Sequence, residues 1–396
     1  MVKESSQLYS RFYLHFPFCF YLFLLDLYMF SHCRHFILIT SDTCTCFSVK
    51  NIASDFFRMP RAWVWPDVQT QSAPFPVPVH IMIRGDFLAI LRTDIPMTSE
   101  ICENTIRKLA EAYPFLEVEQ LTTTAFGRPL YAIEIGDGDR EVIFSAAHHA
   151  NEWITTPLLL KFLEELADAF QKGGKLYGVP AATILKYATI HLVPMVDPDG
   201  VDLVTGAVRP QTPEYGIARQ IAGDFPDIPF PDGWKANLLG VDLNLQYPAG
   251  WLMAREIKFS QGFNRPAPRD YVGRAPLSQR ESRALARYTE DVDPELVLAY
   301  HTQGKAIYWQ FRDYQVPGAK ALAEAFAKAS GYSLEDTPYE SSFAGYKDWF
   351  IQNFRRPGFT IEAGSGTNPL PLSQFDEIYR DNLGILVTAA TGLPEK

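Results

Sequence analysis

The chain has 396 residues, 47% of them hydrophobic, and a formal net charge of −10. This length and apolar content are sufficient for one large α/β domain. The negative charge argues against nucleic acid, or an anionic membrane surface, as the main partner.

The first 58 residues differ from the rest of the chain, because Phe, Tyr, Leu and Cys crowd them. Their longest run without Asp, Glu, Lys or Arg extends from Phe12 to Leu25, which is shorter than the ~20 residues of a membrane-spanning helix. Three interpretations stay open: a signal-like anchor, a natural extension, and a start codon assigned too early. We favour the third, because ordinary globular composition begins at Met59.

Cysteines are unevenly placed, since four of the five lie in this first segment and only Cys102 lies in the remainder. The body of the chain therefore cannot form an internal disulfide, which is compatible with a reducing compartment. We expect a cytoplasmic protein without a membrane span, although the signal-like N-terminus leaves secretion open. Cys102 lies on the apolar face of a predicted helix, which favours a core residue over a nucleophile.

Residues 59–97 are Pro-rich and predict an extended lead-in with short strands at 80–83 and 87–91. Thr98 is placed to cap a helix, and Pro114 ends it. Beyond this helix the chain alternates between apolar runs of strand length and segments with helical periodicity.

Strands are predicted at residues 118–121, 130–135, 142–144, 189–193, 296–300 and 359–361. Helices are predicted at residues 153–170, 319–330 and 372–390. We expect Gly136-Asp137-Gly138 to form a hairpin turn between the strands on either side of it. Residues 205–240, rich in Pro, Gly and Asp, predict a long surface excursion that shapes a cleft. The alternation predicts an α/β fold with a mixed, mostly parallel twisted sheet and helices on both faces.

Two side chains of the kind that bind zinc follow the predicted strand 142–144. His149 and Glu152 lie three residues apart at a strand-to-helix junction, and at this spacing both can face one point. A His-x-x-Glu pattern is common by chance, so a surface turn or a helix N-terminal charge also explains the pair.

Two further strands deliver polar side chains at their carboxyl ends, His301 on one and Glu362 on the other. Ligands of open α/β sheets bind at that edge. Two histidines and one carboxylate leave the fourth position of a zinc ion open for water, which is typical of a catalytic site. Singly, His301 is explained by a hydrogen-bonded core histidine and Glu362 by an ion pair. Their joint placement with His149 and Glu152 favours a catalytic metal centre.

These residues resemble the metal motif of the zinc metallocarboxypeptidases. The resemblance covers roughly residues 98–396 and includes Asp197-Pro198-Asp199-Gly200 and Gly240-Val241-Asp242-Leu243-Asn244. The segments that begin at His301 and end near Pro371 are similar to those of the γ-D-glutamyl-meso-diaminopimelate peptidases, which cut bacterial cell-wall peptides. The resemblance implies a carboxypeptidase-like fold and a murein-derived peptide as substrate. It also implies one zinc ion (Zn2+) per chain, held by His149, Glu152 and His301.

The resemblance further implies roles for residues around the metal. Glu362 corresponds to the base that takes a proton from water and passes it to the leaving amine. Asp242 corresponds to the carboxylate that orients the first metal-binding histidine. Lys235 stands where the family has an Arg that stabilises the oxyanion, and an ordinary surface Lys is the alternative. Tyr346 resembles the mobile tyrosine that closes over substrate, and a packing Tyr is the alternative.

One departure from the family concerns the residue after Asn244. Carboxypeptidases that remove a single C-terminal residue pair this Asn with an Arg that grips the terminal carboxylate, whereas Leu245 stands here. Asn244 keeps the ability to bind a substrate carboxylate or amide. Arg312, Arg355 and Arg356 are candidates for the missing cation, and solvated surface charges explain them equally well.

The sequence therefore predicts three parts: an atypical extension at 1–58, the lead-in at 59–97, and a zinc peptidase domain at 98–396. The favoured function is hydrolysis of the γ-D-glutamyl–meso-diaminopimelate bond of murein peptides. A general zinc carboxypeptidase is the first alternative, which Leu245 disfavours. A catalytically silent module that binds cell-wall peptides is the second, and it would require the loss of a ligand or of the base.

Overall fold

The computed structural model describes residues 35–40, 43–48 and 89–393. The chain divides into two compact units, Met1–Arg84 and Gly85–Lys396. In the first unit, the strands β1 (His35–Thr40) and β2 (Thr43–Ser48) pair antiparallel. None of the described helices is both long enough and apolar enough to cross a membrane.

Two predictions for the N-terminal part of the chain lie outside the described residues, and a third is wrong. The run Phe12–Leu25 and the strand predicted at 80–83 lie outside the described residues. The strand predicted at 87–91 is wrong for its described part, because residues 89–91 form no strand. The backbone N–H groups of Ile90 and Leu91 donate instead to the carboxylate of Glu164, at 2.6 and 3.3 Å.

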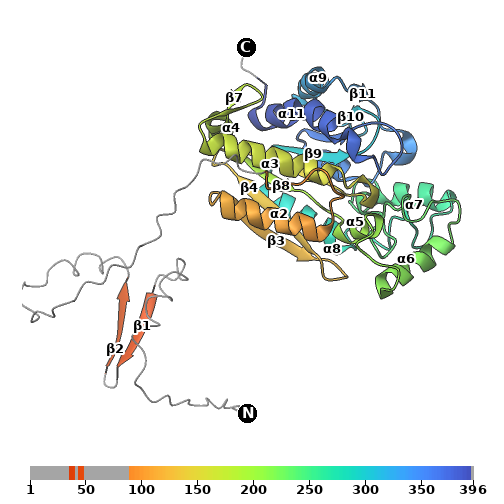
Figure 1. Ribbon diagram of the computed structural model, residues 1–396, viewed down its shortest axis with the longest axis horizontal. Helices are drawn as coiled ribbons and strands as arrows, with labels where there is room; N and C mark the ends of the chain where they lie inside the picture. The colour runs from red at the N-terminus through yellow and green to blue at the C-terminus, as the bar shows by residue number, and fades with distance from the viewer. Residues whose placement is uncertain (1–34, 41–42, 49–88, 394–396) are drawn as a thin grey trace, which may run out of the picture. The chain divides into compact units, whose positions relative to one another are not determined.

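An eight-stranded mixed sheet forms the centre of the second unit, in the order β11-β10-β12-β9-β5-β8-β4-β3 (Figure 1). Its strands are β3 (Glu117–Thr123), β4 (Pro129–Ile135), β5 (Arg140–Ala146), β8 (Ala188–Val193), β9 (Leu296–His301), β10 (Ala306–Tyr308), β11 (Ser333–Glu335) and β12 (Gly358–Glu362). The central strands β12, β9, β5 and β8 are parallel, whereas β4, β3 and β10 pair antiparallel with their inner neighbours. This arrangement confirms the predicted mixed, mostly parallel sheet.

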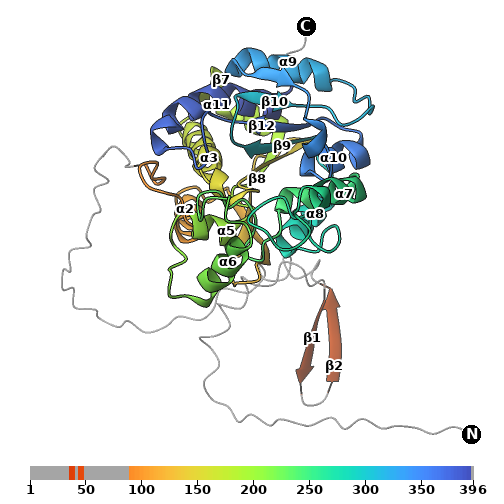
Figure 2. The same cartoon turned by 90° about the vertical axis from the view of Figure 1, so that its right-hand side faces the viewer.

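Successive side chains of a strand point to opposite sides of the sheet, so apolar side chains on both faces must be buried. Helices cover both faces of this sheet. In β5, Phe144 faces the first apolar core and Ile143 faces the second. Figure 2 shows the sheet between two layers of helices. One layer consists of α2 (Ser99–Ala112), α3 (Thr155–Gln171), α4 (Ala181–Tyr187), α9 (Ala319–Ser330) and α11 (Phe375–Thr391), and the other of α7 (Trp251–Ser260), α8 (Arg280–Val292) and α10 (Tyr346–Phe354).

The predicted helix ends follow from capping. Thr98 caps α2, since its Oγ1 accepts a hydrogen bond from the N–H of Ile101 at 3.2 Å. Helix α9 ends before Gly331, whose φ of 78° is left-handed.

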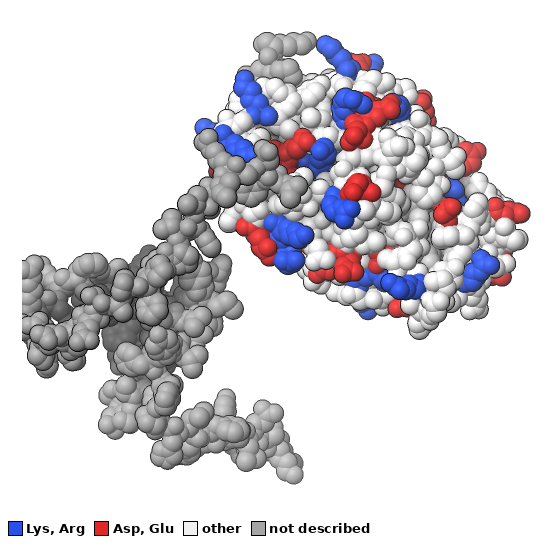
Figure 3. All heavy atoms as spheres, viewed as in Figure 1, with Lys and Arg blue, Asp and Glu red and all other residues white. Residues whose placement is uncertain are grey.

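On the face drawn in Figure 3, Lys and Arg side chains are interspersed with Asp and Glu.

The Gly136-Asp137-Gly138 segment is not the predicted hairpin turn. β8 lies between β4 and β5, so these two strands do not pair. The hairpin joins β3 and β4 instead, where the N–H of Thr124 donates to the carbonyl of Arg128 at 2.8 Å. A Cβ at Gly136 would lie 2.2 Å from the carbonyl oxygen of Ala188, so glycine lets this connection pass close to the start of β8.

The predicted surface excursion at 205–240 has many exposed residues, but it also contains a helix and a buried apolar segment, and we call it the 205–240 lobe. Helices α5 (Pro198–Val204) and α6 (Pro213–Gly223) flank the start of this segment, and α5 begins at the predicted Asp-Pro-Asp-Gly turn. Trp234 and Leu238 are fully buried in a third apolar cluster that also contains Ala150. The lobe therefore packs against the loop that follows β5.

Two short strands, β6 (Lys175–Leu176) and β7 (Val179–Pro180), form a separate hairpin after α3.

Glu281 is a buried carboxyl in the first turn of α8, only 2% exposed. Burial raises its pKa from an ordinary 4.5 to about 7, and the charge of Asp199 adds to this. The folded state then binds a proton more tightly than the unfolded state, so stability falls as the pH rises from 4.5 through about 7.

We predict that Glu281→Gln stabilises the protein by about 1–3 kcal/mol above pH 7, because the neutral amide carries no buried charge. The gain should shrink towards zero near pH 4.5. Urea unfolding of both proteins at several pH values measures it. A difference that does not change with pH would contradict the assigned titration.

Candidate metal centre

The ends of two adjacent parallel strands bring the predicted ligands together. β5 ends at Ala146, and the chain then turns through Ala147, whose φ is 48°. His149 follows in extended backbone, and a 3-10 turn, η3 (Ala150–Glu152), returns Glu152 towards its imidazole. His301 is the last residue of β9, the neighbour of β5 in the sheet. The site thus forms at the carboxyl edge of the central strands, as predicted.

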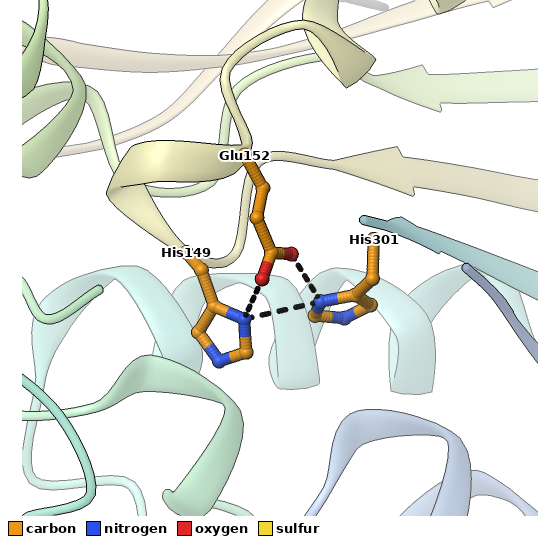
Figure 4. Close-up of side chains that lie close together, drawn as sticks. All are labelled: His149, Glu152 and His301. Carbon is orange, nitrogen blue, oxygen red and sulfur yellow. Dashed lines mark hydrogen bonds and ion pairs between the residues drawn. The ribbon is translucent and has the colours of Figure 1, made fainter. Parts of the chain in front are cut away.

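His149, Glu152 and His301 point towards one another in Figure 4. The Nδ1 of His149 lies 3.0 Å from Oε1 of Glu152, and the Nδ1 of His301 lies 2.8 Å from Oε2. The two Nδ1 atoms are 3.2 Å apart. The side chains of Glu152 and His301 are almost completely buried, whereas that of His149 is 12% exposed. One nitrogen or oxygen from each residue can therefore face a common point.

These residues fit a zinc ion in both chemistry and spacing. Two ligand atoms, each ~2.1 Å from zinc at a tetrahedral angle, are about 3.4 Å apart, which is close to the separations of these three side chains. Two facing imidazole nitrogens are readily explained by a shared cation. Among the described residues, this is the one group of His, Cys, Asp and Glu side chains that converges in this way.

The second nitrogen of each imidazole also has a partner. The Nε2 of His149 lies 3.2 Å from Oδ1 of Asp242, and the Nε2 of His301 lies 3.4 Å from Nδ2 of Asn244. Burial alone would raise the pKa of Asp242, but the charge of His149 and its hydrogen bond hold that pKa far below its usual range. Asp242 offers an acceptor to the N–H of His149 and fixes the orientation of that ring, whereas Asn244 lies beside His301 without an acceptor facing it.

Lys235 and Glu362 also lie at this centre. The Nζ of Lys235 is 2.8 Å from Oε1 of Glu152. Glu362 ends β12 and pairs in register with His301. Burial, and then the negative charge of Glu152, raise the pKa of Glu362 to about 8. The structure thus brings together a cation and a second carboxyl beside the three candidate ligands.

Tyr346 does not lie where the predicted role requires, and this expectation is corrected. Its side chain is fully buried, and its hydroxyl bonds to Oγ1 of Thr289 at 2.8 Å. It packs in the second apolar core, so it cannot close over a substrate without leaving that core. Its contact with the site is through the backbone, since its N–H donates to Oδ1 of Asn244 at 3.0 Å.

The arginines considered as substrate cations contact other parts of the chain. Arg355 stacks on the ring of Tyr314 at 3.7 Å. Arg356 bonds to the carboxylate and carbonyl of Asp293. Arg312 lies over the rings of Phe311 and Phe343, each at 5.3 Å.

His148 is a site residue to which the sequence analysis gave no role. It is fully buried, and its ring stacks on that of His301 with centroids 5.6 Å apart. Burial, and the nearby His301 and His149, hold its pKa well below its ordinary value, so this imidazole is neutral. The sequence around His149 does not predict this packing role, because His301, on which His148 stacks, is distant in sequence.

Comparisons with known proteins agree with this geometry. Residues 102–384 match the family described as zinc carboxypeptidase. The chain is 44% identical over 284 residues to the gamma-D-glutamyl-L-diamino acid endopeptidase 1 of Lysinibacillus sphaericus, covering 72% of this chain and 69% of that protein. It is 34% identical to an uncharacterized protein of Bacillus subtilis (strain 168), covering 72% and 74%.

Solved structures share the fold at low sequence identity. The thrombin activatable fibrinolysis inhibitor superposes with a TM-score of 0.59 at 18% identity, covering 74% of this chain and 73% of that one. Carboxypeptidase A from Helicoverpa armigera gives a TM-score of 0.59 at 17% identity, covering 77% and 76%. The family match spans more than half of the sequence, and the chain belongs to the zinc carboxypeptidase family.

Proposed function

We propose that this protein is a peptidase that hydrolyses the γ-D-glutamyl–meso-diaminopimelate bond of murein peptides, with one zinc ion per chain. The convergence of His149, Glu152 and His301, with Glu362 paired in register beside His301, supports a hydrolase. The substrate class is supported by the relative from Lysinibacillus sphaericus, whose name gives gamma-D-glutamyl-L-diamino acid endopeptidase activity.

Each residue of the site has a role in this proposal. His149, Glu152 and His301 hold the metal, which when bound polarises a carbonyl and makes water more acidic. Glu362 takes a proton from the attacking water and delivers it to the leaving amine.

Lys235 supplies a positive charge for the oxygen that becomes negative as the carbonyl is attacked. Its Nζ lies within hydrogen-bond distance of Glu152, which places this charge beside the candidate ligands. Lys provides a point charge, whereas Arg would provide a planar fork. Asn244 is proposed to contact a carboxylate or amide of the substrate through its Nδ2, which lies 3.4 Å from the Nε2 of His301.

Leu245 favours a substrate other than an ordinary peptide C-terminus. This side chain is 8% exposed and packs in the second apolar core. An apolar residue here provides no bidentate cation for a terminal carboxylate.

We predict cleavage of L-Ala-γ-D-Glu-meso-diaminopimelate between D-Glu and diaminopimelate, with little cleavage of an ordinary peptide at its C-terminus. A chelator should abolish the reaction and added zinc should restore it. Mass spectrometry of the products measures both. Preferential cleavage of the ordinary peptide would indicate a general carboxypeptidase, and binding without cleavage would indicate a silent module.

We predict that His301→Gln lowers the zinc content from one per chain to nearly zero, because a ligand is lost. His191→Gln is the matched control. It removes another buried imidazole, whose ring bonds to Tyr288 and Glu141. Elemental analysis of the two purified variants measures the metal. Equal zinc contents in both would contradict the assigned ligand.

We predict that Glu362→Gln lowers kcat by about 10²–10⁴-fold while zinc stays near one per chain, because the base is lost and the ligands remain. Glu335→Gln, on the exposed strand β11, should leave kcat unchanged. Steady-state kinetics on the murein tripeptide, with zinc analysis of each variant, measure the effect. Retention of activity by Glu362→Gln would remove this residue as the base.

A further inference from the structure

A substrate that carries several free carboxylates requires a cation near the metal centre. Leu245 provides none, Arg356 is bonded to Asp293, and Arg312 and Arg355 lie over aromatic rings. Lys235, which bonds to Glu152, is already assigned to the carbonyl oxygen under attack. Arg269, on the loop between α7 and α8, is a cation that the sequence analysis did not single out.

The backbone on both sides of Arg269 is tied to the site. The carbonyl of Pro268 accepts hydrogen bonds from the N–H groups of Lys235 and Ala236, at 2.8 and 2.9 Å. The N–H of Asp270 donates to Oδ2 of Asp242 at 3.2 Å. Pro268 is thus anchored to Lys235, which contacts Glu152, and Asp270 is anchored to Asp242, which contacts His149. Arg269 is held beside the centre by contacts to two different segments.

Asp270 fixes the direction of the Arg269 side chain. Its Oδ2 accepts a hydrogen bond from Nε of Arg269 at 2.6 Å, and its Oδ1 lies 2.7 Å from Nζ of Lys258. The backbone of Asp270 is left-handed, with a φ of 66°, which non-glycine residues seldom adopt. Such strain is maintained where the surrounding contacts determine the conformation. Both oxygens of Asp270 are therefore in use, and one of them orients the guanidinium.

The far end of the Arg269 guanidinium is free to bind a ligand. Its two terminal nitrogens have no hydrogen-bond partner within the described part of the chain, and 40% of the side chain is exposed. Burial lowers the pKa of Arg269, whereas the charge and hydrogen bond of Asp270, and then the charges of Asp242 and Glu152, raise it. A guanidinium with one edge fixed and the other open can bind a carboxylate through parallel hydrogen bonds.

We propose that Arg269 is a specificity-determining residue that binds a free carboxylate of the substrate near the scissile amide. Leu245 cannot fill this role, because its side chain carries no charge. This inference rests on the proposed function, which supplies the substrate class. Two carboxylates meet the chemical requirement: the α-carboxylate of D-Glu, and one of those on diaminopimelate.

The test compares wild type, Arg269→Gln and Arg269→Lys on the murein tripeptide and on two analogues. One analogue carries an amide in place of the D-Glu α-carboxylate, and the other carries amides on diaminopimelate. Arg269→Gln should lower kcat/KM for the tripeptide by about 10- to 100-fold, mainly through KM, because a charge-assisted contact is lost. This loss should disappear for the analogue that lacks the recognised carboxylate, which identifies its source. Arg269→Lys should recover part of the loss.

Arg265→Gln is the matched control, since Arg265 lies on the same loop and pairs with the exposed Asp224. It should not change kcat/KM. Zinc content and the thermal unfolding midpoint should be unchanged in all variants. An unchanged kcat/KM in Arg269→Gln, or an equal loss on the tripeptide and on both analogues, would overturn the inference.

Failure of the proposed function is recognised separately, as an absence of tripeptide cleavage by the wild type. The inference is then decided by binding, measured by calorimetry with Glu362→Gln protein that carries either Arg269 or Gln at that position. Weaker binding of the tripeptide, or of an ordinary peptide with a free C-terminus, to the Gln form would support it. Equal affinities for both peptides would overturn it.

Discussion

The buried carboxylate of Glu152 is the constraint on which the site depends. A charge that is only 1% exposed must be compensated by nearby partners. His149, His301 and Lys235 surround it, and the backbone N–H of Thr302 donates to its second oxygen at 3.3 Å. These partners come from three segments that are far apart in the sequence. The sheet must hold β5 beside β9, and the 205–240 lobe must pack against the loop that follows β5, for this charge to be tolerated.

Asp242 extends the same network outwards. It accepts hydrogen bonds from the N–H groups of Asn244 and Asp270 as well as contacting His149. The loop that carries Arg269 is therefore linked to a candidate metal ligand through one carboxylate. Orientation of the imidazole and placement of a substrate contact depend on the same side chain, so the two cannot be altered independently.

The sequence predicted the parts of the site that depend on local pattern. His301 and Glu362 could be placed because each directly follows a short apolar run, and parallel strands deliver their ends to one edge. The order of the strands could not be predicted in the same way, since the insertion of β8 between β4 and β5 depends on non-local pairing. Tyr346 matched a motif, but its location follows from packing in the second core. Arg269 gave no signal, because backbone contacts of its neighbours place it beside the site.

Ala150, between the two ligands of the 149–152 loop, is fully buried in the apolar cluster of the 205–240 lobe, and its N–H donates to the carbonyl of Lys235 at 3.1 Å. Opening of that lobe would remove these contacts of Ala150, which help to hold both His149 and Glu152 in place. Retention of a zinc ion bound by these candidate ligands would therefore be thermodynamically coupled to a folding equilibrium of a region distant in sequence. Metal release from the zinc-loaded protein would then report how often this lobe opens.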